Sequence, residues 1–386
     1  MKTLKIMSVV GARPNFMKIA PFCHAIERYQ ASAGAVVLEH LLVHTGQHYD
    51  VRMSQTFFET LGIPTPDIDL EVGSGSHAQQ VGNTMIAFEK VLQAHRPDWV
   101  VVVGDVNATC ACSITAKKEG IKVAHIEAGL RSFDLGMPEE INRMVTDRLS
   151  DLLLTPDRLS NENLRREGVP ESRMVFVGNI MIDTLEAQRQ AAARLDIDNI
   201  IRNNLVDGAA VPARIAGREY GLMTLHRPSN VDRQEVLKPL VDFFREASGR
   251  FPLLWPIHPR TLKQLQQFGL LDPVSKTPSL ILLHPLGYHD MLRLNMDAAI
   301  MLTDSGGLQE ECCVLGTPCM TLRWNTERPI TLSENGGASV LVGNDVERLR
   351  TAFGNALQGG RRPQRPELWD GLTADRILAA ILGARS

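Results

Sequence analysis

The sequence predicts an α/β protein with two doubly wound parallel-sheet domains and a ligand cleft between them. Short apolar runs alternate with stretches of helical periodicity from the N-terminus to about residue 342, which is the β-α-β pattern of parallel sheets. The alternation stops once, between about residues 184 and 218, where the sequence becomes rich in Ala and Asn. A chain of 386 residues is also long enough for two or three domains of ordinary size.

In the first half, the strands are predicted from short runs of apolar and β-branched residues at 4–10, 36–44, 99–103, 122–126, 151–155 and 174–177. Helices are predicted between them from apolar residues at helical spacing, at 17–29, 51–61, 79–96 and 108–118. Pro138 opens a further helix after the fourth of these strands. Because helices follow strands throughout, we expect one parallel sheet with helices on both faces.

The second half repeats the pattern, with strands predicted at 220–225, 253–257, 280–283, 298–302, 319–322 and 339–342. A helix at about 182–195 and a loose connection after it fit a domain linker. Residues 361–366 (RRPQRP) fit a hinge, and Thr373 is the predicted N-cap of a last helix that crosses back onto the first domain. We therefore expect domains at 1–183, completed by 367–386, and at 184–366.

Composition excludes several classes of protein. Hydrophobic residues make up 44% of the chain and charged residues 22%, as in soluble globular proteins. A net charge of −3 gives no reason to expect nucleic acid or membrane surfaces as partners. No apolar run approaches the ~20 residues of a membrane span, so we expect a cytoplasmic protein. The cysteines lie in apolar surroundings without zinc spacing, which predicts buried, reduced thiols and no metal site.

Acidic residues follow two of the predicted strands. Glu127 stands at the end of the 122–126 strand, and Asp105 follows the 99–103 run. Ligands of open α/β sheets bind outside the carboxyl ends of the strands, so we interpret Glu127 as a functional acid and Asp105 as a candidate. Helix capping is the alternative for Asp105. Glu139 and Glu140 lie in the first turn of a helix, where the dipole alone accounts for Glu140 and is the alternative for Glu139.

Two strand-to-helix turns could hold an anion. The first contains Gly11, Arg13 and Lys18 without a GxGxxG fingerprint. Arginine and lysine suit phosphate oxygens, and ordinary surface cations are the equal alternative. The second turn is richer in glycine and is the stronger candidate; it is the run Thr303-Asp304-Ser305-Gly306-Gly307.

The second turn opens a helix whose free N–H groups can hold a diphosphate, with Glu311 one turn further on to accept ribose hydroxyls. A plain strand-to-helix turn is its alternative. His226 and His258 also follow predicted strands, with Arg227 adding a positive charge. A single histidine at a strand end is more often structural, whereas several ionisable groups at one edge favour a site. Tyr288 is a candidate for lining a base or sugar pocket.

The motifs become specific in combination. Nine of them occur in order: GARPNFMKIAP, HTGQHYD, VVVVGDVNAT, HIEAGLRS, MPEEINR, VGNIMIDT, LHRPSN, LTDSGGLQEE and NTERP. From about residue 6 to 342 the chain thereby resembles the non-hydrolysing UDP-N-acetylglucosamine 2-epimerases. The resemblance implies two Rossmann-like domains of the B-type glycosyltransferase fold (GT-B), a homodimer, and reversible conversion of UDP-GlcNAc to UDP-ManNAc without a redox cofactor or a metal.

The family's chemistry removes the C2 proton of the sugar while UDP departs, giving 2-acetamidoglucal, and then adds UDP back with protonation from the opposite face. By motif position, the resemblance implies that the catalytic residues are Asp105, Glu127, Glu139 and His226. It implies that the substrate-binding residues are Arg13, Lys18, Gln47, His48, Arg143, Asn179, Arg227, His258, Tyr288, Asp304, Ser305, Gly306, Gly307, Glu311 and Arg328.

Two departures from the family pattern leave alternatives open. Many members have HRREN where this chain has HRPSN at 226–230, and residues 73–80 differ from members that UDP-GlcNAc activates allosterically. An epimerase for a UDP-2,3-diacetamido-uronate sugar therefore remains an alternative, although it needs an extra cation. A GT-B glycosyltransferase would gain nothing from three acids, a silent nucleotide-sugar sensor would be expected to lose them, and a hydrolysing relative would need only that water intercept the glycal.

Overall fold

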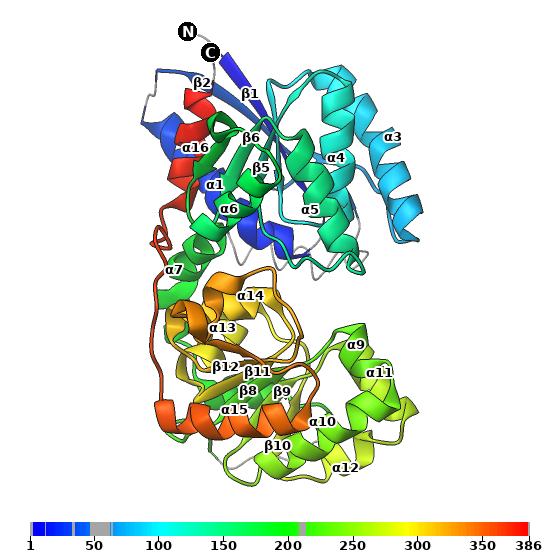
Figure 1. Cartoon of the computed structure of the whole chain (residues 1–386), viewed down its shortest axis with the longest axis vertical. Helices are drawn as coiled ribbons and strands as arrows, with labels where there is room; N and C mark the ends of the chain where they lie inside the picture. Colours follow the sequence, from blue (N-terminus) through cyan, green and yellow to red (C-terminus); the bar gives the residue numbers. More distant parts are fainter. Residues whose placement is uncertain are drawn as a thin grey trace. The chain divides into compact units, whose positions relative to one another are not determined.

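The computed structural model describes residues 3–11, 13–32, 35–46, 62, 65–207 and 214–384, with only the backbone at 13 and 14. Contacts within the chain divide it into two compact units. Unit 1 comprises residues 1–184 and 366–386, and unit 2 comprises residues 185–365. Figure 1 shows both units as α/β folds. Within the described residues, no helix is long and apolar enough to cross a membrane.

In the described part of unit 1, seven strands form one parallel sheet in the order β3-β2-β1-β4-β5-β6-β7. The sequences of these strands are mainly apolar, with many β-branched residues, because strands of a parallel sheet are covered on both faces. They are β1 (Thr3–Val10), β2 (Val37–His44), β3 (Ile68–Asp69), β4 (Trp99–Val103), β5 (Lys122–Ile126), β6 (Leu152–Thr155) and β7 (Met174–Phe176).

Helices between these strands and after the last of them accompany the sheet. They are α1 (Arg13–Ala31), α3 (His77–His95), α4 (Asn107–Lys118), α5 (Pro138–Leu149), α6 (Arg158–Arg166) and α7 (Ile180–Ala193), with a 3₁₀ turn η1 at Glu171–Arg173. A capping box begins α3: Ser76 accepts from the N–H of Gln79, and the Gln79 side chain accepts from the N–H of Ser76. The helix predicted at 51–61 lies outside the described residues.

The chain order reverses once in the sheet of unit 1. From β1 the chain proceeds outward through β2 and β3, then returns to the other side of β1 with β4. This reversal leaves a crevice at the carboxyl ends of the two strands, because the loops that follow them depart in opposite directions. Gly11 follows β1 and Gly104 follows β4, so the sequence around both residues is placed at this switch point.

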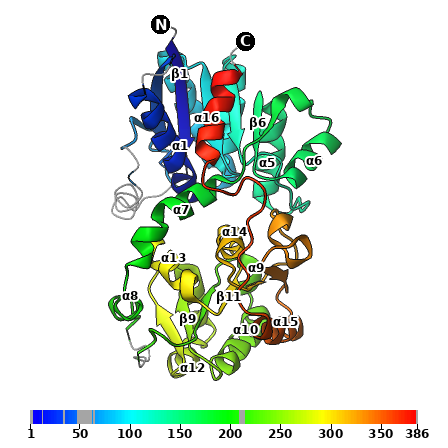
Figure 2. The ribbon, with the colours of Figure 1, turned by 90° about the vertical axis from the view of Figure 1, so that its left-hand side faces the viewer.

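The last helix, α16 (Thr373–Gly383), belongs to unit 1 and lies beside α1, as both Figure 1 and Figure 2 show. The prediction that Thr373 caps it is wrong, because Thr373 is its first helical residue. The cap is the carboxylate of Asp183 in α7. It accepts from the backbone N–H of Thr373 at 3.1 Å and of Ala374 at 2.7 Å. A residue distant in sequence therefore supplies the missing acceptor.

In the described part of unit 2, six strands form a second parallel sheet in the order β10-β9-β8-β11-β12-β13. They are β8 (Gly221–Thr224), β9 (Leu253–Pro256), β10 (Leu280–Leu283), β11 (Ile300–Thr303), β12 (Cys319–Thr321) and β13 (Ser339–Leu341). The chain order reverses between β8 and β11, as it does between β1 and β4 in unit 1. His226 follows β8 and Asp304 follows β11, so this switch point also carries residues that the sequence singled out.

The helices of unit 2 are α8 (Ile197–Asn203), α9 (Pro228–Val231), α10 (Gln234–Ala247), α11 (Pro259–Gln267), α12 (Leu271–Ser275), α13 (Tyr288–Asp297), α14 (Gly306–Leu315) and α15 (Val346–Gly359). Two 3₁₀ turns, η2 (Pro329–Thr331) and η3 (Ser333–Asn335), precede β13. The short helix α8 lies in the stretch that the sequence predicted as a loose connection.

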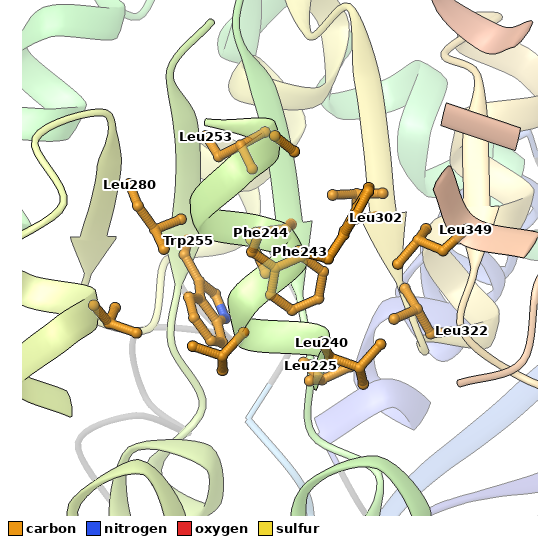
Figure 3. Packing of buried hydrophobic residues seen from close by; sticks show 14 of the residues in the cluster. Leu225, Leu240, Phe243, Phe244, Leu253, Trp255, Leu280, Leu302, Leu322 and Leu349 are labelled. Atoms are coloured by element: carbon orange, nitrogen blue, oxygen red, sulfur yellow. The ribbon is translucent and has the colours of Figure 1, made fainter. Parts of the chain in front are cut away.

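Leucine and aromatic side chains fill the core between the sheet and helices α10 and α15 of unit 2 (Figure 3). The rings of Phe244 and Trp255 meet edge to face at 5.8 Å, and those of Phe243 and Phe353 do so at 5.7 Å. All four side chains are buried. Truncating such a ring to Ala typically costs about 3–5 kcal/mol, so this core gives the site at the sheet edge a rigid base.

The predicted hinge at 361–366 is attached to unit 2 over most of its length. Arg362 N–H donates to the carbonyl of Gly316 at 3.0 Å, and Gln364 N–H donates to that of Cys313 at 2.9 Å. The Arg361 guanidinium donates to the carbonyl of Leu315 at 2.9 Å. The segment therefore satisfies carbonyls at the end of α14 that the helix itself leaves without partners.

Candidate functional site

The carboxyl ends of β4 and β5 enclose an ion pair in unit 1. Lys18 of α1 pairs with Glu127, and their side chains are only 8% and 3% exposed. Gly104, directly after β4, has φ +68°, and a Cβ added there would lie 3.2 Å from Lys18 Nζ. Asn15 Nδ2 donates to the carbonyl of Val103 at 2.9 Å, which joins α1 to the end of β4. A cation and an acid thus meet at the switch point.

Glu127 reaches this position through an unusual backbone conformation. Its φ is +71°, in the left-handed region that residues other than Gly, Asn and Asp seldom adopt. Its N–H donates to the carbonyl of Leu154 at 3.1 Å, so the adjacent strand β6 holds the turn. Such strain costs of the order of 1–3 kcal/mol and tends to occur at functional sites.

Asp105 forms a second polar group with α5. Its carboxylate, 24% exposed, pairs with Arg143, whose side chain is 2% exposed. Asn142 Nδ2 donates to the carbonyl of Asp105 at 2.9 Å. The capping alternative is wrong, because Val106 is the N-cap of α4 and no side chain caps that helix. Arg143, predicted to bind substrate, is buried and pairs with the carboxylates of Asp105 and Glu140.

Glu140 has a larger role than its helix position suggested, and the interpretation that the dipole alone accounts for it is wrong. Its buried carboxylate accepts from Ser132 N–H at 3.0 Å, Ser132 Oγ at 2.9 Å and Phe133 N–H at 2.9 Å. It also accepts from Arg143 Nε at 3.0 Å. Burial raises the pKa of Glu140, but the hydrogen bonds from Ser132 and Arg143 outweigh it and lower that pKa overall. Glu140 therefore joins the loop before α5 to the arginine that holds Asp105.

The other predicted residues of unit 1 have different surroundings. Glu139 is exposed in the first turn of α5. Asn179 is fully buried, and its Oδ1 accepts from Met181 N–H at 2.9 Å at the start of α7. Arg13 is the first residue of α1, with a side chain outside the described part of the structure. Two further predictions, Gln47 and His48, lie outside the described residues.

At the switch point of unit 2, one buried acid organises several donors. Asp304 Oδ1 lies 2.7 Å from His226 Nδ1, and the two side chains are 0% and 40% exposed. Asp304 Oδ2 accepts from the N–H of His226 at 3.0 Å and of Arg227 at 2.8 Å. It also accepts from Asn230 Nδ2 at 3.1 Å. Burial raises the pKa of Asp304, but the hydrogen bond and charge of His226 outweigh it and lower that pKa overall.

Two more side chains, the His258 ring and the Arg227 guanidinium, lie at the same turn as His226. The rings of His226 and His258 are 5.6 Å apart. His258 is the N-cap of α11, where its Nδ1 accepts from Arg260 N–H at 3.2 Å. Burial and the neighbouring His226 lower the pKa of His258. Arg227 Nε donates to the carbonyl of Asp304 at 2.9 Å, which fixes the guanidinium at the same turn.

Helix α14 begins next to these residues with Ser305 as its N-cap. No side chain caps the helix, so its first N–H groups are available to an anion, as predicted from the glycines. A Cβ added at Gly306 would lie 2.7 Å from Glu327 Oε1 and 2.8 Å from Arg328 Nη1. A Cβ at Gly307 would meet nothing within 4 Å. The protein's own packing thus accounts for Gly306 but not for Gly307.

Arg328, predicted to bind substrate, is 7% exposed and pairs with Glu310 at 2.8 Å and with Glu327. Arg323 pairs with Glu327 at 2.6 Å, so two arginines and two glutamates form a buried cluster behind Gly306. In a buried cluster of this kind each charge depends on its partners, because removing one leaves the other without compensation.

Glu311 lies inside unit 2, beside Tyr288 at the start of α13 and Asn295 near its end. Burial raises the pKa of Glu311 to about 7, opposed by the Tyr288 hydroxyl and the Asn295 amide. Both groups are themselves buried. The predicted ribose acceptor is therefore an acid whose protonation changes near neutral pH.

We predict that Glu311→Gln removes a pH dependence of stability. The ordinary pKa of this carboxyl is 4.5 and the folded value is about 7. The protonated form therefore stabilises the fold fully below about pH 4.5, and this stabilisation of about 3 kcal/mol is lost as the pH rises through 7. The variant should be more stable than the parent at pH 8.5 and gain nothing at pH 4.5. Urea titrations of both proteins test this; a difference that does not change with pH contradicts it.

A cavity of about 820 Å³ lies elsewhere in unit 2, between β13, α15 and residues 359–364. None of the residues predicted from the sequence lines it, so the chemistry of the switch point and this cavity are separate features. Among the described residues, no group of three or more His, Cys, Asp and Glu side chains is arranged to hold a metal ion. The cysteines are buried, as predicted.

Sequence reasoning missed several residues that hold these groups in place. His125, the first residue of the HIEAG motif, has the pattern of an ordinary strand residue and is not among the predicted site residues. Asn15 and Asn230 were not singled out, although each ties a helix to a strand end. Asparagine next to a strand-to-helix turn is the signal that could have identified both, because its amide can satisfy a carbonyl at the strand end.

The chain matches the family model of UDP-N-acetylglucosamine 2-epimerase over residues 31–382. UDP-N-acetylglucosamine 2-epimerase of Methanocaldococcus jannaschii is 39% identical, with 98% of this chain and 99% of that protein covered. A crystal structure of that enzyme in complex with UDP-GlcNAc and UDP matches with a TM-score of 0.86 over 99% of this chain and 100% of that one, at 39% identity.

A relative named for another substrate is almost as similar. UDP-2,3-diacetamido-2,3-dideoxy-D-glucuronate 2-epimerase of Pseudomonas aeruginosa is 38% identical, with 92% of this chain and 94% of that protein covered. A lipopolysaccharide outer core galactosyltransferase is 13% identical with a TM-score of 0.52 over 99% of both chains, which shows a shared fold alone. The two parallel-sheet units are thus of the GT-B kind that the sequence predicted. The family model and the identities agree across nearly the whole length, and the chain belongs to the UDP-N-acetylglucosamine 2-epimerase family.

Proposed function

We propose that this protein interconverts UDP-GlcNAc and UDP-ManNAc by eliminating and re-adding UDP. The observation that carries the proposal is that each sheet has one part of the required chemistry at its switch point. Unit 1 has acids at the ends of β4 and β5, and unit 2 has cations and a free helix N-terminus at the ends of β8 and β11. A proton has to be moved and a diphosphate has to be held, and these are the groups that do so.

In the proposed elimination, a base takes the C2 proton, the C1–C2 double bond forms, and the C1–O bond breaks with its electron pair passing to the diphosphate. Glu127 is suited to be a base because its carboxylate has a permanent counter-charge in Lys18. Asp105 is the second acid of unit 1, held by Arg143. Returning a proton to the opposite face of C2 needs a second acid or base, which is the role we assign to Asp105 or to Glu139.

In unit 2 the proposed task is to stabilise the departing diphosphate. The first N–H groups of α14 have no side-chain cap and can bind an anion, and Asp304 fixes the backbone of His226 and Arg227 at the neighbouring turn. His226 is partly exposed, which leaves its second ring nitrogen available to a phosphate oxygen. We assign Asp304 itself to positioning, because its carboxylate is fully buried and bound by protein donors. Groups fixed in advance stabilise a developing charge without paying for reorganisation.

Proton NMR of UDP-GlcNAc with the enzyme in D₂O tests the proposal. We expect UDP-ManNAc to appear with deuterium at C2. Release of free ManNAc would show a hydrolysing enzyme. UDP-GlcNAc is also tested in excess, so that it can act as an activator as well as a substrate. If it still stays unchanged, the same experiment with a UDP-2,3-diacetamido-glucuronate decides whether the P. aeruginosa relative indicates the substrate. Absence of C2 exchange with both sugars would reject the proposal.

The glycines at the start of α14 provide a matched pair of variants. Gly306→Ala should displace Glu327 and Arg328 and destabilise unit 2 by about 1–3 kcal/mol. Gly307→Ala meets open space and should keep the stability of the parent within about 1 kcal/mol. We nevertheless expect Gly307→Ala to weaken UDP binding at least about tenfold, since a diphosphate approaching the helix would meet the new methyl group. Calorimetric titration with UDP measures this, and unchanged affinity would show that the diphosphate does not approach Gly307.

We also propose that the protein is a homodimer. Large apolar side chains are exposed on α3, on α5 and in the loop before α5, and exposed apolar groups of this kind commonly mark interfaces. They are Ile86 (62% exposed), Phe133 (72%), Leu135 (66%), Ile141 (51%) and Met144 (42%). Light scattering after gel filtration should give the mass of two chains, and Ile141→Glu should give one. Val37→Glu, at a residue of β2 that is 44% exposed, is the control that should leave the mass unchanged.

A further inference from the structure

His125 lies in β5, two residues before Glu127, and its side chain is completely buried. Both of its ring nitrogens have partners. Nδ1 lies 2.6 Å from Asp147 Oδ1, on α5, and Nε2 lies 2.8 Å from the carbonyl oxygen of Gly104. The ring therefore connects β5 with α5 on one side and with the turn after β4 on the other.

The identity of these two partners determines where the protons are. A backbone carbonyl can only accept, so Nε2 must carry a proton. Asp147 also pairs with Arg131 at 2.7 Å and accepts from Gly129 N–H at 3.0 Å, so several donors surround this carboxylate. Burial raises the pKa of Asp147, but the charges and hydrogen bonds of His125 and Arg131 outweigh it and lower that pKa overall. An ionised carboxylate only accepts, so Nδ1 must carry a proton as well.

The charges around the ring balance within unit 1. With both ring nitrogens protonated, His125 and Arg131 supply two positive charges, and Asp147 supplies one negative charge at their centre. Glu167, after α6, supplies the second negative charge by pairing with Arg131 Nε at 2.7 Å. A buried ionic network of this kind is stable only when all its members have partners, and this one has them.

The peptide group that His125 holds is the one between Gly104 and Asp105. Gly104 has φ +68°, and its N–H donates to the carbonyl of Ile126 at 3.1 Å, so β5 binds this residue on both sides. A Cβ added at Gly104 would lie 3.2 Å from Lys18 Nζ and 3.6 Å from Glu127 Oε2. The turn held by the ring thus lies next to the pair of Lys18 and Glu127, with little room for a side chain at Gly104, and it leads directly into Asp105.

We propose that His125 is a positioning residue of the epimerase, held as a doubly protonated imidazolium that fixes the Gly104–Asp105 peptide relative to Glu127. The role rests on the proposed function, whereas the protonated state of the ring rests on the structure alone. The ring contacts no substrate; it acts by holding two acids that do, in a reaction where a displacement of about 1 Å can cost about 10²-fold in rate.

Nitrogen-15 NMR of the histidine rings in the full-length protein tests the protonated state at pH 7. We expect the His125 ring to show the signature of imidazolium, with both nitrogens protonated. His40 is an internal control: it is half-buried, desolvation lowers its pKa to about 4, and its Nε2 lies 2.9 Å from Ser8 Oγ. It should show a neutral ring in the same spectrum. A neutral ring at His125 overturns the proposal, whatever the activity of the enzyme.

Kinetics test the positioning role. His125→Gln retains an amide N–H for the Gly104 carbonyl, whereas His125→Leu retains no donor. We expect kcat to fall about tenfold in the first and about 100-fold in the second, with the KM for the sugar nucleotide and the Kd of UDP within about threefold of the parent. The proposal is overturned if His125→Gln has the same kcat as the parent. It is also overturned if kcat/KM falls because KM rises while kcat stays the same. His40→Gln should leave kcat, KM and Kd unchanged.

The outcomes separate this proposal from the proposed function. If the parent protein turns over none of the UDP-sugars, the proposed function is rejected. The NMR spectrum still tests the protonated state of His125, because that measurement needs no enzymatic activity. If His125→Leu is not recovered as folded protein, His125→Gln and the spectrum of the parent decide.

Discussion

Glu127→Gln is expected to lower kcat by about 10²–10⁴-fold while the Kd of UDP stays the same, because the groups that we assign to the diphosphate lie in the other unit. The amide cannot take up a proton at C2, yet it keeps the size of the carboxyl and can remain beside Lys18. The C2 exchange in D₂O should fall in parallel with the rate of epimerisation, since both depend on the same proton transfer. Initial rates and calorimetric titration with UDP measure the two quantities.

Stability has to be measured alongside these rates. Lys18 is buried next to Glu127, and neutralising the acid leaves a buried ammonium without its counter-charge. We therefore expect Glu127→Gln to be less stable than the parent but folded at 25 °C. Glu162→Gln, at a half-exposed acid of unit 1, is the matched control and should change neither rate nor stability. Turnover close to that of the parent would remove Glu127 from the mechanism.

Asp304→Asn should have the largest effect in unit 2. The acid accepts from two backbone N–H groups and from Asn230, and it pairs with His226. The new amide keeps one acceptor but brings N–H donors toward groups that also donate. We expect a loss of about 2–3 kcal/mol in the free energy of unfolding. His226 and Arg227 should then lose their fixed positions, so that the affinity for UDP falls at least about tenfold.

The control for Asp304→Asn is an Asp-to-Asn substitution on the protein surface. Asp297→Asn removes an acid that is half exposed and pairs with Arg293 at 2.7 Å. Exposed pairs of this kind contribute about 0–1 kcal/mol, so stability and UDP affinity should stay near those of the parent. Denaturant titration and calorimetry of the two variants give the comparison. Equal effects in both would show that Asp304 does not organise the site.

The strands and their ends could be predicted from the sequence because buried parallel strands are short, continuous apolar runs. That pattern located β4, β5, β8 and β11, and it thereby located the residues that follow them. Side-chain partners could not be predicted in the same way. Glu140 was interpreted from its place in the first turn of α5, since nothing in the local sequence reveals that Ser132, Phe133 and Arg143 converge on it.

The same limit explains two other results. His125 has the spacing of an ordinary strand residue, and its two partners come from a turn and a helix that are distant in sequence. Thr373 has the right composition for an N-cap, yet Asp183 fills that role from α7. In each case a contact between distant segments decides the function of a side chain, and periodicity carries no information about such contacts. The roles of the site residues themselves stay predictions that the variants above address.

The placement of α16 has a consequence for the order of events during synthesis. Unit 1 is finished only by residues 366–386, which leave the ribosome after all of unit 2. Domains generally fold as units while the chain emerges. Here unit 1 lacks its last helix, with the face of α1 that α16 covers and the Asp183 carboxylate both exposed, until some 180 further residues have been translated at roughly 5–20 residues per second. Unit 2, continuous in sequence, can complete its fold first, and the nascent N-terminal half is then the part that chaperones would meet.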